Sequence, residues 1–218
     1  MIYLFEDKEG RMELFLKETI DDGFLKKVVM NCKIDEITSY IEEHFSDADL
    51  VLFHKSYIFP QSGVTNEAVR EVFLAEGIPF VYFSGQSSNS VGRTEKGIQT
   101  ADVRSEDMYL HLPDFIQDYK QTGKANIPLL VFGKDYLMNT LLKVLEWVNN
   151  KLWSSPDGEP MNMGQVQIIR SGINARMPED ELKDDRAALI KFIDEHRATG
   201  DLTPSLLLGQ IQRIIDQH

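Results

Sequence analysis

Two short apolar runs, Ile2-Tyr3-Leu4-Phe5 and Leu50-Val51-Leu52-Phe53, decide the fold of this chain. Each run has the length of a buried strand, and each ends on polar residues: Glu6-Asp7 after the first and His54-Lys55 after the second. In an open α/β sheet, the residues that bind ligands or catalyse reactions lie at the carboxyl ends of the strands. The sequence therefore predicts a sheet edge that carries an acidic pair and an imidazole.

Helical patterns alternate with these runs through the first 120 residues. Apolar residues recur at helical spacing over residues 7–20 and 34–45, and further strands are predicted at residues 27–30, 80–83 and 108–112. Parallel strands require crossover connections, which are most often helices. We therefore predict an α/β fold with three layers, in which helices cover both faces of a central parallel sheet.

One further helix is marked by its ends. Thr65 is a suitable N-cap, and Gly77 stands where a helix should stop before the strand at residues 80–83. The run at residues 127–132 is consistent with either a strand or the start of a helix.

The pattern changes towards the C-terminus. Residues 135–152 have the clearest helical periodicity in the chain, whereas residues 153–165 lose all periodicity and concentrate proline and glycine. We therefore predict a first domain of residues 1–152, which ends with this long helix, and a C-terminal extension of residues 153–218.

The C-terminal extension is predicted to be mainly helical. Residues 166–170 suggest a strand, a helix should open at Pro178 with acidic residues in its first turn, and the final helix should begin at Thr203-Pro204. Two such helices alone would leave apolar faces in water, so we expect them to pack on the α/β part or on another chain.

Composition excludes several classes of function. The 218 residues carry a formal charge of −12, whereas non-specific binding to nucleic acid depends on Lys and Arg side chains that displace counterions. No apolar run approaches the ~20 residues of a membrane helix, and no basic stretch precedes a long apolar region. We therefore expect no nucleic-acid partner, no membrane segment and a cytoplasmic location. The single cysteine, Cys32, cannot form an internal disulfide.

Cofactor motifs are absent from the sequence as well. Gly-x-Gly-x-x-Gly, Gly-Lys-Ser/Thr and Gly-x-Ser-x-Gly do not occur, so nucleotide cofactors, phosphate loops and hydrolase elbows have no direct support. We expect no cofactor, with Mg²⁺ at Glu6 and Asp7 as the one exception.

The order and spacing of these elements over about residues 1–125 resemble a response-regulator receiver domain. Glu6-Asp7 follow the first strand, as the magnesium-binding acidic pair of that family does, and Ser84 ends the fourth strand, where the family keeps a switch hydroxyl. The resemblance implies a flavodoxin-like fold and a Mg²⁺ site at the acidic pair.

Two positions depart from the receiver pattern. The third strand offers no phospho-accepting aspartate, and His54 occupies that place. The lysine that precedes proline after the fifth strand is replaced by Leu112 in the dipeptide Leu112-Pro113. The chain therefore resembles a pseudo-receiver that cannot run the aspartyl-phosphate chemistry of the family in the usual way.

Each candidate residue also has an ordinary structural role. Asp7 is suited to cap a helix, and His54 is suited to be a hydrogen-bonded histidine at a strand end. The polar loop that begins with Ser84 and Gly85 either offers donors to a small anion or simply connects two elements. Alternatively, Glu6, Asp7 and His54 are chemically suited to hold a divalent ion.

Two functions follow from these alternatives. The favoured one is a non-enzymatic signalling or protein-interaction module: a degenerate receiver-like domain whose helical C-terminal part provides output or dimerisation, with a protein partner or a second copy bound. The alternative is a metal-dependent or small-anion-binding enzyme of flavodoxin-like fold that uses Glu6, Asp7 and His54, with Lys55 and the Ser84 loop close by.

Overall fold

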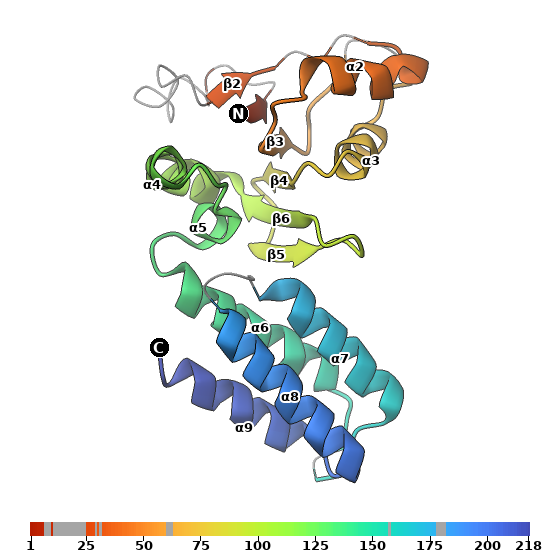
Figure 1. Cartoon of the computed structure of the whole chain (residues 1–218), viewed down its shortest axis with the longest axis vertical. Helices are drawn as coiled ribbons and strands as arrows, with labels where there is room; N and C mark the ends of the chain where they lie inside the picture. Colours follow the sequence, from red (N-terminus) through yellow and green to blue (C-terminus); the bar gives the residue numbers. More distant parts are fainter. Residues whose placement is uncertain are drawn as a thin grey trace. The chain divides into compact units, whose positions relative to one another are not determined.

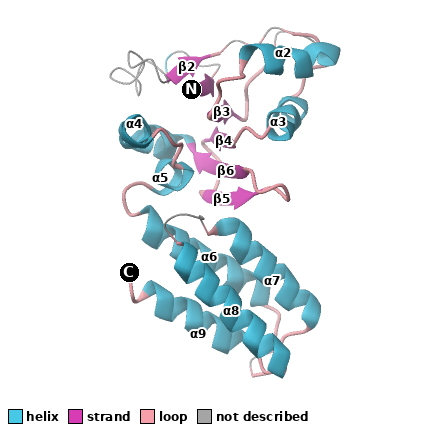
Figure 2. Ribbon diagram, in the orientation of Figure 1, coloured by secondary structure: helices cyan, strands magenta, loops and turns pink. Residues whose placement is uncertain are grey.

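A computed structural model of the chain describes residues 1–6, 10, 25–28, 30, 32–59, 63–156, 158–177 and 182–218. The chain forms two compact units, Met1–Lys134 and Asp135–His218. The first unit combines strands and helices and the second is helical (Figures 1 and 2). The helix predicted at residues 7–20, with Asp7, lies outside the described residues apart from residue 10, and so does the helix start predicted at Pro178.

A six-stranded sheet with the order β2-β1-β3-β4-β6-β5 forms the centre of the first unit. Its strands are β1 (Ile2–Phe5), β2 (Leu25–Lys27), β3 (Leu50–His54), β4 (Phe80–Ser84), β5 (Ser90–Arg93) and β6 (Gln99–Arg104). Neighbouring strands pair in parallel except for β5, which pairs antiparallel with β6 at one edge. The predicted α/β class with a mainly parallel sheet is therefore confirmed.

The two apolar runs that predicted the sheet lie side by side within it. β1 and β3 pair in parallel with Phe5 beside Phe53, and every residue of both strands is buried. Strands that are covered on both faces need apolar residues at every position rather than at alternate ones. This requirement explains why both runs are continuous.

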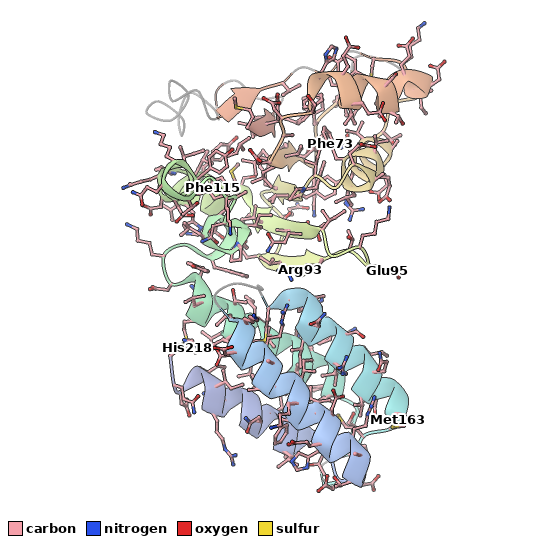
Figure 3. The ribbon with its side chains drawn as sticks, viewed as in Figure 1. Phe73, Arg93, Glu95, Phe115, Met163 and His218 are labelled. Carbon is pink, nitrogen blue, oxygen red and sulfur yellow. The ribbon has the colours of Figure 1, made fainter. Side chains whose placement is uncertain are left out.

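Helices cover the two faces of the sheet (Figure 1). On one face lie α2 (Ile37–His44), which follows the short 3₁₀ helix η2 (Ile34–Glu36), and α3 (Asn66–Ala75). On the other face lie α4 (Ser105–Thr122) and α5 (Ile127–Phe132). Figure 3 labels one core residue of each layer, Phe73 on α3 and Phe115 on α4.

Local signals place the ends of α3 as predicted. The Thr65 hydroxyl accepts a hydrogen bond from the Ala68 N–H at 3.2 Å, and Gly77 adopts a φ of +80° two residues after the helix ends. A left-handed backbone of this kind favours glycine, which has no β-carbon to clash. The chain then turns directly into β4.

The strand predicted at residues 108–112 is wrong, because these residues belong to α4. Met108 and Leu112, with Phe115 and Tyr119 further along, are buried at helical spacing on one face of α4. Pro113 suggested a strand end, but it lies inside the helix, where it removes the N–H that would bond to the carbonyl of residue 109. The fifth parallel strand is instead β6, whose polar composition concealed it.

The described part of the second unit contains four helices around one apolar core. They are α6 (Tyr136–Leu152), α7 (Met163–Arg176), α8 (Lys183–Thr199) and α9 (Pro204–Ile215). The strand predicted at residues 166–170 is wrong, because Val166, Ile169 and Ile173 are buried at the helical spacing of α7. The predicted Thr203 cap is confirmed, since its hydroxyl accepts a hydrogen bond from Leu206 N–H at 3.3 Å.

The long helix α6 belongs to the second unit, and the boundary lies between residues 134 and 135. The sequence placed it between residues 152 and 153, with this helix in the first domain. The buried residues Leu141, Val144, Val148 and Leu152 of α6 share one core with α7, α8 and α9. An amphipathic helix predicts that a partner surface exists but does not specify which one.

Of the helices in the described ranges, none combines the length and hydrophobicity that a membrane span requires.

Helices α6 and α7 approach closely at Gly172. A β-carbon at this position would lie 1.9 Å from Cη2 of Trp147, far inside van der Waals contact. The guanidinium of Arg176, one turn further along α7, lies 4.1 Å from the centre of the same indole ring. The ring is therefore held against the backbone of α7 by a cation–π contact, and residue 172 has room only for hydrogen.

We predict that Gly172→Ala destabilises the helical unit, whereas Gly209→Ala stabilises it. The first substitution forces Trp147 away and should lower the free energy of unfolding by about 1–3 kcal/mol. Gly209 lies within α9 with open space around it, so alanine there should raise the free energy of unfolding by about 0.5–1 kcal/mol through helix propensity alone. Urea denaturation of the full chain measures both changes, and a stabilising Gly172→Ala would contradict this close packing of α6 on α7.

Candidate functional site

The carboxyl edge of the sheet carries the residues that the sequence singled out. Glu6 directly follows β1, His54 ends β3 and Ser84 ends β4. The register places Phe5 beside Phe53 and His54 beside Phe83, so Glu6 and His54 each follow one member of the same strand pair, Phe5 and Phe53. Glu6 and His54 therefore both stand at the carboxyl ends of their strands, and the site predicted from them stays a prediction.

Glu6 is held inside the protein by α4. Its side chain is only 1% exposed, and its Oε2 accepts a hydrogen bond of 2.9 Å from the Tyr109 hydroxyl. The Tyr109 ring packs edge-on against Phe83 of β4, with 5.8 Å between ring centres. A buried carboxyl group is costly unless it is hydrogen-bonded. The bond to Tyr109 therefore ties α4 to the end of β1.

His54 is buried on the same side of the sheet. The residue is 3% exposed, and its ring packs against Phe83 with 5.0 Å between ring centres. Its Nδ1 accepts a hydrogen bond from the Ser56 N–H at 3.3 Å, which places the proton of the neutral ring on Nε2. The hydrogen bond to the next turn favours the structural role considered for this histidine, and its burial keeps bulk solvent away from the ring.

Lys55 faces the opposite side of the sheet. Its ammonium group forms an ion pair with Asp102 of β6 and lies 5.7 Å from the centre of the Tyr82 ring on the strand between them. Burial, and then the charge of Glu67, raises the pKa of Tyr82 to about 12, so the phenol stays neutral. Lys55 therefore belongs to a surface arrangement over β4 and does not join Glu6 and His54.

The loop after β4 is hydrogen-bonded within itself. The hydroxyls of Ser84 and Ser87 lie 3.0 Å apart, and the Gln86 N–H donates to the Ser84 hydroxyl at 3.4 Å. Gly85 is exposed between them. Hydroxyls that bond to each other and to the loop backbone are less available to an anion. The connector role considered for this loop is thus the better supported one.

Asn89 fastens the far end of this loop. Its Oδ1 accepts from the Arg104 N–H at 2.9 Å, and its Nδ2 donates to Asp107 Oδ2 at 2.8 Å and to the Val131 carbonyl at 3.3 Å. One amide therefore joins the loop to the first turn of α4 and to α5. These bonds use both donors and one lone pair of the side chain.

One predicted site residue lies outside the described residues, and two other predicted positions do not join Glu6 and His54. Asp7 lies outside the described residues, so the Mg²⁺ site predicted for Glu6 and Asp7 remains a prediction. Lys55 points to the other face of the sheet. Leu112-Pro113 lies within α4 and not after a strand, so the position assigned to it by the receiver resemblance is corrected. Among the residues that the structure describes, no group of three or more His, Cys, Asp or Glu side chains is arranged to hold a metal ion.

Two residues of this edge were not predicted from the sequence. Tyr109 follows Met108 in an apolar stripe, and the polar tip of a buried tyrosine normally requires a partner, which was the available signal. Asn89 stands among serines in a polar loop, and nothing in the local pattern distinguishes it from a solvated residue. Its partners come from segments 15 to 42 residues away.

No protein-family model, curated protein or solved structure matches the chain. The geometry of the molecule itself is therefore the basis for a functional proposal.

We predict that Tyr109→Phe destabilises the first unit. The substitution removes a hydrogen bond to a buried carboxyl group and should lower the free energy of unfolding by about 1–3 kcal/mol. Tyr40→Phe is the matched control, because Tyr40 is only half-buried and its ring packs on His44. Equal effects of the two substitutions in urea denaturation would show that the bond to Glu6 contributes nothing particular.

We predict that Asn89→Ala also destabilises the first unit, because it leaves the Arg104 N–H and the Val131 carbonyl without this partner. The expected loss is about 0.5–1.5 kcal/mol, the usual net contribution of a hydrogen bond between groups that are partly accessible to water. Ser88→Ala, an exposed position in the same loop, should change the stability by less than about 0.5 kcal/mol. Hydrogen exchange of the amide at residue 104 provides a local readout. Unchanged protection of this amide in Asn89→Ala would contradict the role given to the Asn89 side chain.

Proposed function

We propose that the chain is a non-enzymatic protein-interaction module whose first unit is a degenerate receiver-like domain. The helical second unit would provide output or dimerisation. Two features support this proposal: the order of the strands in the sheet, and the burial of the polar groups at its carboxyl edge.

The strand order supports the receiver-like part of this proposal. If the antiparallel β5 is set aside, the parallel strands run β2-β1-β3-β4-β6. That order corresponds to the 2-1-3-4-5 arrangement of flavodoxin-like folds. The flavodoxin-like assignment rests on this correspondence and on the helices that cover both faces.

The burial of Glu6 and His54 is the observation that carries the non-enzymatic part. A catalytic group has to reach a reacting atom of the substrate. The side chains of Glu6 and His54 are 1% and 3% exposed, and α4 and Phe83 lie against them. Such groups are better placed to fix α4 on the sheet than to meet a phosphodonor. A protein that keeps this fold but has no accessible catalytic groups at this edge is suited to act by binding other proteins.

The alternative, a metal-dependent or anion-binding enzyme, keeps one favourable observation. Glu6 and His54 lie on neighbouring strands, as such a site would need. A divalent ion or a small anion would then bind the folded state and raise its melting temperature. Ion binding therefore separates the two functions.

We predict that the full chain gains no phosphoryl group from acetyl phosphate in the presence of Mg²⁺. Neither an acceptor aspartate nor an exposed imidazole is available at the end of β3, so intact-mass spectrometry should find the unmodified mass. A receiver protein known to accept phosphate from acetyl phosphate serves as the positive control.

Thermal denaturation with Mg²⁺, Mn²⁺, Zn²⁺ or inorganic phosphate completes the test. A melting temperature that rises with ion concentration, and no longer does so in Glu6→Gln, would contradict the proposal and favour the enzyme. Phosphorylation that His54→Ala abolishes would contradict it equally.

A further inference from the structure

The outward side of α7 in the second unit carries no charged residue. The exposed residues of this helix, which we call the α7 face, are Met163, Gly164, Gln167, Ile168, Ser171 and Asn174. Every other helix of eight residues or more in the described ranges exposes at least one Asp, Glu, Lys or Arg side chain. The α7 face therefore differs from the rest of the helical surface.

The two cations of α7 are bound by neighbouring helices. The Nε and Nη2 atoms of Arg170 donate to Oδ1 and Oδ2 of Asp194 on α8, each at 3.0 Å. The guanidinium of Arg176 lies over the ring of Trp147 on α6. A partner that covers the α7 face therefore leaves both cations with their present partners and buries no unpaired charge.

Large apolar side chains are exposed on this face and beside it. Ile168 is 57% exposed, Met163, labelled in Figure 3 at the N-terminal end of α7, is 64% exposed, and Trp153 is 86% exposed. Trp153 belongs to the turn after α6, which is tied to the first turn of α7 by a hydrogen bond of 2.9 Å from Gln165 Nε2 to Ser155 Oγ. The cores of protein–protein interfaces are enriched in Trp and Met and depleted of charged residues. This surface therefore has the composition of an interface core.

The charge of the chain favours a second copy as the occupant of the α7 face. Each copy carries a formal charge of −12, so two copies repel each other wherever their acidic surfaces approach. A basic partner would instead be attracted to the acidic surfaces and gain little from an uncharged one. An uncharged face is complementary to itself, because a two-fold axis brings the same residues of both copies together. Two copies that meet at α7 therefore bring no carboxylate of this face against another.

We propose that the chain forms a symmetric dimer in which the α7 faces of two copies pack against each other. Ile168 lies near the middle of α7, so in this dimer it lies close to the two-fold axis. The small side chains of Gly164 and Ser171 on either side of it let the two helices approach closely. Trp153 and Met163 extend the contact away from the axis.

The inference specifies the dimerisation named in the proposed function and rests on that function. The two fail separately, because they concern different parts of the chain. A chain that stays monomeric overturns the inference alone, whereas ion binding or phosphorylation at the carboxyl edge of the sheet overturns the proposed function alone.

Sedimentation equilibrium of the full chain, from about 1 μM to about 1 mM, measures the association. We expect a reversible equilibrium between monomer and dimer with a Kd of about 100 μM or tighter. An increase in NaCl from about 0.05 M to about 0.5 M should lower the Kd, because salt screens the repulsion between two copies of charge −12. A dimer held by ion pairs would show the opposite response to salt.

Matched substitutions locate the interface. Ile168→Glu brings a carboxylate of each copy close to the other at the two-fold axis and should raise the Kd at least about tenfold. Leu110→Glu is the control, because it makes the same chemical change at a 70% exposed residue of α4 in the first unit. This control should change the Kd less than about twofold. Gln167→Glu, a nearly isosteric change on the α7 face, should raise the Kd at least about threefold.

A mixture of two variants tests the symmetry of the dimer. Ile168→Lys alone should also associate weakly, because it brings two ammonium groups together at the axis. An equimolar mixture of Ile168→Glu and Ile168→Lys places opposite charges there and should associate at least about tenfold more tightly than Ile168→Glu alone.

Four results would overturn the inference. These are a monomer at every concentration, a dimer that salt weakens, equal effects of Ile168→Glu and Leu110→Glu, and no recovery in the mixture of the two Ile168 variants. Thermal denaturation of each variant shows whether it is folded. Because positions 110, 167 and 168 are exposed, these substitutions should leave the fold intact, and Gln167→Glu decides the question if Ile168→Glu does not fold.

Discussion

Parallel pairing of β1 with β3, buried on both faces, is the constraint on which the first unit depends. Phe5 and Phe53 stack at the carboxyl end of this pair with 5.0 Å between ring centres, and no residue of either strand is more than 3% exposed. Parallel neighbours cannot be joined by a tight turn, so the chain has to cross over through helices. The layer of α2 and α3 on one face follows from that requirement, whereas α4 and α5 come after the last strand and cover the other face.

The same pairing determines where polar groups stand. Glu6 follows β1 and lies under α4, while His54 ends β3 and packs on Phe83, so neither faces solvent. The hydrogen bond from Tyr109 offsets part of the cost of burying the Glu6 carboxyl group. Glu6 and His54 are therefore part of the core of this unit, whereas Lys55 next to them in sequence keeps its charge at the surface in an ion pair with Asp102.

The predictions that were correct depend on residues that are close together in the sequence. The runs at β1, β3 and β4, the Thr65 cap and the stripe of α6 depend on residues close in sequence, and all are found in the structure. β6 escaped notice because it is polar, with only Ala101 and Val103 buried along it. Its strand state depends on pairing with β4, which no short window of sequence contains.

The sequence by itself determined the α/β class, the buried central strands and the residues that end them, because continuous apolar runs and helical spacing are local consequences of burial. Only the tertiary structure decided that Lys55 faces away from Glu6, that Tyr109 and Asn89 close the carboxyl edge, and that α6 joins the second unit. These features arise from contacts between segments far apart in the chain. Side-chain direction across a sheet and the choice of packing partner depend on the whole fold, and an amphipathic pattern leaves both open.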